Sequence, residues 1–411
     1  MTNENLHQFF AQNADALLYF YHLARIMGEV IFYYGGLFME VLIQNFSYIT
    51  WQMLVMWAIG GTLIYLAIVK EMEPTLLLPM GFGAILVNLP IAVEGTGVQH
   101  VLDTLFSIGI DDAELFPLML FIGIGAMIDF QPLPTNPKLM IFGAAAQFGI
   151  FFTLALASLL GYDLRDAASI SIIGAADGPT SIFVATELGS KYLGAIMVAA
   201  YSYMALVPLI QPPIIKLCTT KAERRIKMQY KGKPVSKTTK ILFPIVVTVI
   251  VGLVAPDAVA LIGFLMFGNL IRECGVMNSI SETAQNALAN LITIFLGITI
   301  ASQMKAADFL QLDTLIIIGL GLVAFIFDTF GGIMVAKLMN LFSKEKINPM
   351  ISAAGISAFP MSARVVHKLG LEEDNQNFLL MHSIGVNVSG QIASVIAGGL
   401  ILALVKAQIG G

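Results

Sequence analysis

Long apolar runs separated by short charged or Pro-rich turns cover the chain from about residue 50 to its end. A run of about 20 apolar residues can cross a bilayer as a helix. The pattern therefore predicts an all-α polytopic membrane protein with about ten to twelve membrane segments. The runs lie at about 50–69, 75–93, 114–128, 139–160, 192–215, 241–254, 258–271, 288–303, 314–339, 349–363 and 378–405. Residues 1–24 are amphipathic instead, which predicts a helix on the membrane surface.

One further apolar stretch, Ser171 to Gly189, is interrupted in its middle by an acid, glycines and a proline. Its sequence is SIIGAADGPTSIFVATELG, and the acid is Asp177. Gly178 and Pro179 cannot sustain a regular helix, and a broken backbone is tolerated at membrane depth only where protein or a wet cavity surrounds it. Broken helices of this kind hold cations in transporters, and an ionisable group within them indicates a functional site.

The broken stretch has a twin 181 residues later, in the second half of the chain. That offset pairs Ser171 with Ser352, Gly174 with Gly355, Pro179 with Pro360, Ser181 with Ser362 and Val184 with Val365. Nearby offsets pair Phe82-Gly83 with Phe267-Gly268, Gly123 with Gly297, and Gly143 with Gly319. The sequence thus predicts two structural repeats, broadly 75–215 and 258–405, whose broken or re-entrant helices meet at the membrane midplane. By precedent in transporters, we expect the repeats to be inverted.

A basic loop separates the two halves. Nine Lys or Arg residues and a single acid, Glu223, lie between Lys216 and Lys240, which predicts a cytoplasmic loop by the positive-inside rule. The loop either sets only the topology or also binds a partner. Four parts follow: an N-terminal extension (1–48), a first membrane half (49–215), the basic loop (216–240) and a second membrane half (241–411).

Composition agrees with a chain that lies largely in lipid, because 57% of its residues are hydrophobic and only 12% are charged. Cys218 and Cys274 have no spacing typical of a disulfide framework or a thiolate metal site. The five histidines show no zinc-ligand pattern. We expect no nucleic-acid partner.

Polar residues with oxygen donors interrupt the apolar runs of the second half. They include Asn348, Ser357, Asn387 and the neighbouring Ser389, Gln391 and Ser394. Together with the carboxylate of Asp177, such oxygens suit an alkali cation, and sodium fits them better than a transition metal. For any single serine, close helix packing explains its presence equally well.

Two further charged residues lie within or beside apolar runs. Asp328, in FIFDTFGG, serves either structural pairing or function. Arg364 follows the second broken stretch, where its guanidinium could pair with a buried acid or bind a substrate carboxylate. The residues alone support cation transport, and they do not choose between a coupled sodium pump and a sodium-dependent carboxylate symporter.

Four motifs resemble the membrane beta subunit of the sodium-pumping biotin-dependent decarboxylases, a family with oxaloacetate, methylmalonyl-CoA, glutaconyl-CoA and malonate types. They are GAADGPTSIFVA around Asp177, FGNLIRECGV at 267–276, NPMISAAGISAFPMSARV at 348–365 and NVSGQIAS at 387–394. The resemblance runs from about residue 50 to the end. It implies that the chain removes carbon dioxide from carboxybiotin and exports sodium with the free energy released.

The resemblance also implies roles for particular residues. Asp177, Asn348, Ser357 and Asn387 would bind sodium, Arg364 and Ser357 would bind carboxybiotin, and Asp177, Tyr203 and Arg364 would carry the chemistry. Tyr203 would donate a proton and Arg364 would hold the carboxylate, although an interhelical hydrogen bond and membrane anchoring explain these two residues equally well.

The chain has no A-M-K-M setting for a biotinylated lysine, so biotin is expected on another chain. The implied partners are a biotin carrier subunit, a carboxyltransferase subunit and a small single-span membrane subunit, in an oligomeric assembly in the inner membrane.

Overall fold

The computed structural model describes residues 22–30, 32–34, 46–90, 97–112, 114–229, 235–358 and 360–409, and all regular structure in these ranges is helical. The helices of the first half are α3 (Trp51–Val69), α4 (Pro74–Val87), α5 (Gly97–Phe106), α6 (Leu115–Met127), α7 (Pro132–Thr135), α8 (Leu139–Ala145), α9 (Phe148–Leu159), α10 (Leu164–Ser171), α11 (Gly178–Glu187), α12 (Leu193–Cys218) and α13 (Lys221–Arg224). Those of the second half are α14 (Lys237–Val254), α15 (Val259–Glu273), α16 (Asn278–Thr283), α17 (Ala289–Ala301), α18 (Ala306–Phe309), α19 (Leu312–Phe342), α20 (Met361–Glu373) and α21 (Leu380–Ile409).

Seven helical stretches of the described chain are long and apolar enough to cross a membrane. They are Trp51–Val69, Leu139–Leu159, Leu193–Cys218, Lys237–Val254, Asn278–Ala301, Leu312–Phe342 and Leu380–Ile409. The prediction of an all-α polytopic membrane protein is therefore confirmed, whereas the count of ten to twelve segments stays a prediction. Most of the predicted amphipathic segment 1–24 lies outside the described residues. Its last three residues, 22–24, are described and are helical.

The outer helices turn large apolar side chains away from the protein. Trp51 in α3 and Leu253 in α14 are 66% and 80% exposed. By contrast, most of α21 between Ser383 and Leu402 is buried. Exposed apolar faces of this extent indicate contact with lipid. The polar residues of α21 lie inside the protein instead, because that helix is buried.

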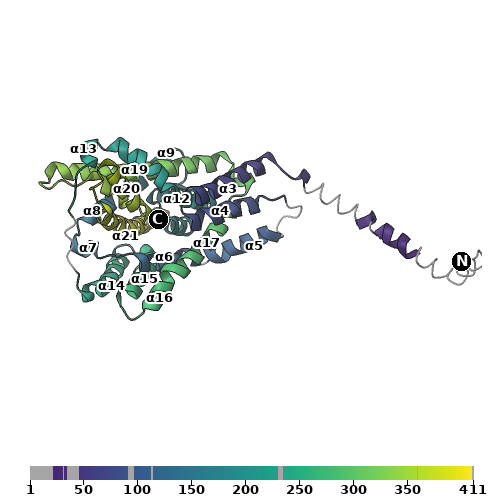
Figure 1. Cartoon of the computed structure of the whole chain (residues 1–411), viewed down its shortest axis with the longest axis horizontal. Helices are drawn as coiled ribbons and strands as arrows, with labels where there is room; N and C mark the ends of the chain where they lie inside the picture. The colour runs from purple at the N-terminus through teal and green to yellow at the C-terminus, as the bar shows by residue number, and fades with distance from the viewer. Residues whose placement is uncertain are drawn as a thin grey trace, which may run out of the picture.

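Helices from the two halves pack against one another in a reciprocal way. In the duplicated pattern, α15 matches α4 and α17 matches α6. Helix α4 packs on α17, and α15 packs on α6. Likewise α12 packs on α19 and α21 packs on α8. Figure 1 shows the resulting body, with α3, α4 and α17 adjacent and α12, α20 and α21 near its middle. The core therefore mixes both halves.

Candidate functional site

The first broken segment is a hairpin. Asp163 caps α10 by accepting hydrogen bonds from the backbone N–H groups of Arg165 and Asp166. After α10 the chain passes through a 3-10 turn, Ile172–Ala175, and reverses at Ala176, whose φ of 50° is left-handed. Helix α11 then returns. The Ser190 hydroxyl beyond its end donates a 2.7 Å hydrogen bond to Asp166 near the start, so both outer ends of the hairpin lie together.

Asp177 lies at the tip of this hairpin because it is the N-cap of α11. Its side chain accepts a hydrogen bond from the backbone N–H of Thr180 at 3.3 Å. Pro179 is favourable at the start of a helix, where its missing N–H has no partner to lose. The sequence D-G-P therefore both ends the first arm and starts the second.

The second broken segment has the same form. Asn348 caps a 3-10 turn, Pro349–Gly355, by accepting a hydrogen bond from the Met350 N–H at 3.1 Å, and α20 follows. Its two outer ends meet at Arg224. The Asn348 amide donates to the Arg224 carbonyl oxygen at 2.9 Å, and the Arg224 guanidinium donates to Glu373 at 2.6 Å.

The tips of the two hairpins contact each other, as the duplicated pattern predicts. The Ser357 N–H donates to the Ala175 carbonyl oxygen at 2.9 Å, and the Ser357 hydroxyl donates to Asp177 Oδ2 at 3.0 Å. From α21, the Ser394 hydroxyl donates to the same oxygen at 2.8 Å. Asp177 is only 4% exposed. A buried carboxylate thus stands where three elements meet.

Five buried side-chain oxygens on the hairpins and α21 have no hydrogen-bond partner among the described residues: Thr180 Oγ1, Thr186 Oγ1, Ser383 Oγ, Asn387 Oδ1 and Gln391 Oε1. The Asn387 amide nitrogen donates to the carbonyl oxygens of Ala354 and Ile356, and that of Gln391 donates to the Ser357 carbonyl oxygen. Both amides therefore direct their donors into the second hairpin. Unpaired buried oxygens need an explanation, and hard oxygen donors suit an alkali cation.

The remaining predicted residues lie elsewhere on these elements. Tyr203 in α12 is 6% exposed, and its hydroxyl donates to the Ile318 carbonyl oxygen of α19. Arg364 is exposed on the first turn of α20. Asn348 bonds to the basic loop at the outer end of its hairpin. Asp177 and Ser357 are thus in direct contact, and Asn387 bonds to the same hairpin as Ser357.

Sequence reasoning did not place Ser394, Thr180 or Tyr201 beside Asp177 or its turn. Ser394 belongs to the polar cluster of NVSGQIAS, but the pattern did not indicate which of its members would reach Asp177. Tyr201 is fully buried and its hydroxyl has no partner among the described residues. Its ring lies so close to Gly178 that any side chain at position 178 would collide with it. The glycine of D-G-P therefore serves packing as well as the turn.

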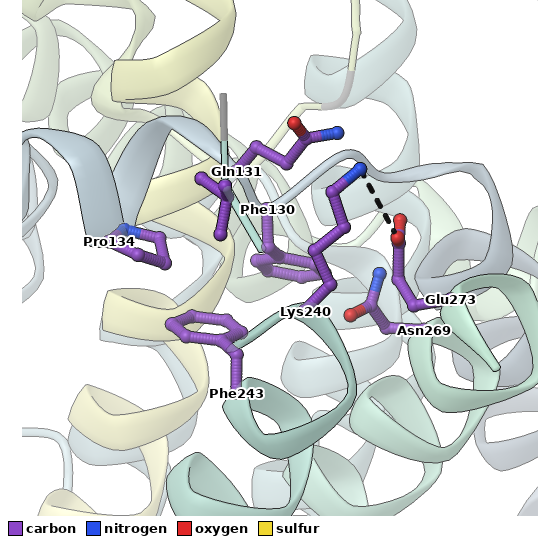
Figure 2. Close-up of a pocket in the computed structure, with 8 residues that line it drawn as sticks. Phe130, Gln131, Pro134, Lys240, Phe243, Asn269 and Glu273 are labelled. Atoms are coloured by element: carbon purple, nitrogen blue, oxygen red, sulfur yellow. Dashed lines mark ion pairs between the residues drawn. The ribbon is translucent and has the colours of Figure 1, made fainter. Parts of the chain in front are cut away.

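The basic loop is tied to the protein by ion pairs. Lys216, Arg224 and Lys227 pair with the acidic run Glu372, Glu373 and Asp374 at the outer end of the second hairpin. At the loop's other end, Figure 2 shows Lys240 directed at Glu273, 3.7 Å away, above the rings of Phe130 and Phe243. At least four of the loop's nine basic residues therefore pair with acids of the second half.

A buried acid near the far end of the first hairpin gives a testable dependence on pH. Glu114 is the N-cap of α6 and is 9% exposed. Burial raises the pKa of its carboxyl group to about 8. The negative charge of Glu187 also raises this pKa, and the positive charge of Lys406 lowers it. A carboxyl with a raised pKa favours folding while protonated, below its ordinary pKa, and this contribution disappears as pH rises through about 8. We expect the free energy of unfolding to fall by roughly 2 kcal/mol between pH 6 and 8, as Glu114 ionises.

The measurement is thermal unfolding of the purified wild type and of Glu114→Gln at both pH values. The variant stays neutral, so its melting temperature should fall less than that of the wild type as pH rises. Equal falls in the two proteins would show that Glu114 is ionised throughout.

Comparisons with known proteins agree with the motifs of the two hairpins. The family described as Na⁺-transporting oxaloacetate decarboxylase beta subunit matches residues 52–405. The chain is 48% identical over 374 residues to methylmalonyl-CoA decarboxylase subunit beta of Propionigenium modestum, covering 85% of this chain and 94% of that one. It is 50% identical over 364 residues to glutaconyl-CoA decarboxylase subunit beta of Acidaminococcus fermentans (88% and 96%). It is 44% identical over 426 residues to oxaloacetate decarboxylase beta chain of Haemophilus ducreyi (89% and 98%).

Proposed function

The chain belongs to the family of Na⁺-transporting oxaloacetate decarboxylase beta subunits, and we propose that its paired hairpins couple carboxybiotin decarboxylation to sodium export. It is the membrane subunit of a sodium-pumping, biotin-dependent decarboxylase, and biotin is carried by a partner subunit. The family match over both hairpins carries this conclusion. It favours the coupled decarboxylase over the sodium-dependent carboxylate symporter, because the relatives with this sequence are decarboxylase subunits.

Sodium binds, in this proposal, at the tips of the two hairpins. The carboxylate of Asp177 supplies the charge, and the hydroxyl oxygen of Ser357 and the amide oxygen of Asn387 supply neutral ligands. The unpaired oxygens of Thr180 and Gln391, and the Ser394 hydroxyl, complete the set of donors. A charged ligand with several neutral oxygens suits a hard monovalent cation. The contact of Ser357 and Ser394 with Asp177 supports the proposal most directly.

The predicted sodium-binding role of Asn348 rests on its amide oxygen and on the family resemblance. Its side chain donates to two carbonyl oxygens of the basic loop, Arg224 and Ile226, and accepts from Met350. These bonds fix the outer end of the second hairpin. We therefore propose that Asn348 influences the sodium site through the position of that hairpin, while direct binding of sodium stays a prediction.

Arg364 and Tyr203 are proposed to serve the decarboxylation. Carboxybiotin supplies a carboxylate that leaves as carbon dioxide, and the ureido nitrogen left behind must gain a proton. The exposed guanidinium of Arg364 is suited to bind the carboxylate with two hydrogen bonds, with Ser357 as a further contact. The phenol of Tyr203 is the proposed proton donor; the same hydroxyl makes an interhelical hydrogen bond to Ile318, so it would exchange that bond during turnover.

We propose that the two hairpins re-enter the membrane from opposite faces and meet near its midplane. The joined ends of each hairpin support re-entry rather than crossing. The seven long helices and the shorter α4, α6 and α15 would then make ten crossings, five in each half. An odd number of crossings inverts the second half relative to the first, and the reciprocal packing of α4 on α17 and α15 on α6 fits that symmetry.

The relatives are named subunits of decarboxylases, so this chain is one component of a larger complex. The proposed partners are a biotin carrier, a carboxyltransferase and a small single-span membrane subunit, with further copies of the chain itself. We place the complex in the inner membrane, surrounded by lipid, with the basic loop 216–240 in the cytoplasm. The four parts with boundaries at 48, 215 and 240 stay a proposed division of the chain.

Release of carbon dioxide from free carboxybiotin tests the proposed function. The purified complex should release it only when sodium is present, because the decarboxylation step waits for the occupied sodium site. Potassium at the same concentration and ionic strength is the control. Release at the full rate in potassium alone would separate the chemistry from sodium and contradict the coupled mechanism.

A further inference from the structure

Asp328 is a second buried acid that the proposed mechanism leaves without a role. It lies in α19, is fully buried, and its Oδ1 accepts a hydrogen bond from the Gly149 N–H in the first turn of α9, at 2.5 Å. The positive end of the α9 helix dipole adds to this attraction. One oxygen of Asp328 thus ties the start of α9 to the middle of α19.

The other oxygen of Asp328 faces the first hairpin. Oδ2 has no hydrogen-bond partner among the described residues. It lies against Gly174, where an added Cβ would be 2.6 Å from Oδ2 and 2.8 Å from the Cβ of Ala324. Gly174 belongs to the 3-10 turn Ile172–Ala175, which ends two residues before Asp177. The carboxyl group of Asp328 therefore packs directly against the backbone turn that leads to Asp177, the proposed sodium-binding acid.

Helix α19 also contacts this hairpin at a second point. A Cβ on Gly321 would be 2.7 Å from a methyl group of Ile173 and 2.9 Å from the ring of Tyr203. The 3-10 turn is thus held along two turns of α19, by apolar contact at Gly321 and by a polar group at Asp328. The polar group is the unusual one, because burying a carboxyl group in place of an apolar residue is unfavourable.

We propose that Asp328 is a positioning residue, which joins α9 and α19 to the back of the first hairpin and thereby sets the position of Asp177 relative to Ser357 and Ser394. This inference rests on the proposed sodium site. Groups that orient metal ligands typically change metal affinity by about 10- to 100-fold when they are removed. Loss of Asp328 should therefore weaken sodium binding more than it slows a cycle saturated with sodium.

Two substitutions of Asp328 separate positioning from other roles. Asp328→Ala removes the bond to Gly149 and empties the space behind Gly174, so the KM for sodium in carboxybiotin decarboxylation should rise about tenfold, with kcat within about twofold of the wild type. Asp328→Asn keeps an oxygen for the Gly149 N–H and the same shape against Gly174. It should restore the KM to within about twofold of the wild type. Thr329→Val, the next buried residue of α19, is the matched control and should leave the KM unchanged.

Gly174→Ala tests the same contact from the other side and decides the question if Asp328→Ala does not assemble. Its methyl group should push the hairpin away from α19 and also raise the KM for sodium. An unchanged KM in an assembled Asp328→Ala protein, or in Gly174→Ala, overturns the proposal. Asp328→Asn as impaired as Asp328→Ala also overturns it, because charge or protonation would then matter rather than position. Failure of the proposed function is distinct, since the wild type itself would then show no dependence on sodium.

Discussion

We expect Asp177→Asn to abolish sodium uptake and sodium-dependent carbon dioxide release, while the protein still inserts and assembles. The amide keeps the shape of the carboxyl group, but it removes the charge that would balance a cation in a site of low dielectric. Removing one partner of a buried charge pair costs about 3 to 5 kcal/mol, which corresponds to at least about a hundredfold loss of sodium affinity. The measurement is sodium uptake into proteoliposomes that contain the complete complex.

Asp129→Asn is the matched control for this substitution. Asp129 is half-buried in the turn after α6, where its carboxylate accepts hydrogen bonds from the backbone and side chain of Gln131. It contacts neither hairpin through these bonds, so its variant should transport sodium at the wild-type rate. Wild-type uptake by Asp177→Asn would instead remove Asp177 from the sodium site.

Arg364→Lys and Tyr203→Phe are expected to impair the decarboxylation itself. Lysine keeps the positive charge but cannot bind a carboxylate through two parallel hydrogen bonds, so the KM for carboxybiotin should rise at least about tenfold. Phenylalanine removes the proposed proton donor, and kcat should fall by about a hundredfold. Both variants are assayed with free carboxybiotin at saturating sodium over a range of pH.

The exposed Lys368 provides a control one turn further along α20, and Lys368→Arg should behave as the wild type. Sodium binding should persist in both catalytic variants, because neither side chain bonds to Asp177. If Arg364→Lys and Tyr203→Phe both decarboxylate carboxybiotin at the wild-type rate at every pH, then neither residue has its proposed role. Tyr203 would then serve only its bond to Ile318.

The break in each hairpin could be predicted from sequence because its causes are local. Gly178 and Pro179 exclude a continuous helix, and Pro360 marks the matching position in the second half. Contact between the breaks followed from the duplication, and the bond from Ser357 to Asp177 agrees with it. The family, and with it the function, followed from the long motifs around these breaks.

Other parts of the site depend on packing between distant elements, which a single sequence does not specify. Ser394 reaches Asp177 because α21 presents that face to the hairpin tips, whereas Ser389 on the same helix bonds to the carbonyl oxygen of Leu139. Asn348 looked equivalent to Asn387 in sequence. In the fold it lies at the outer end of its hairpin, because Arg224 of the basic loop holds it there.

The ratio of sodium ions transported to carbon dioxide released tests the coupling most directly. Both quantities are measured together in proteoliposomes containing the complete complex, at several sodium concentrations, for the wild type and Asp177→Asn. Tight coupling at the paired hairpins predicts a constant ratio in the wild type and the loss of both activities in the variant. Carbon dioxide release by Asp177→Asn without sodium uptake would contradict it, because the chemistry would then proceed without the cation site.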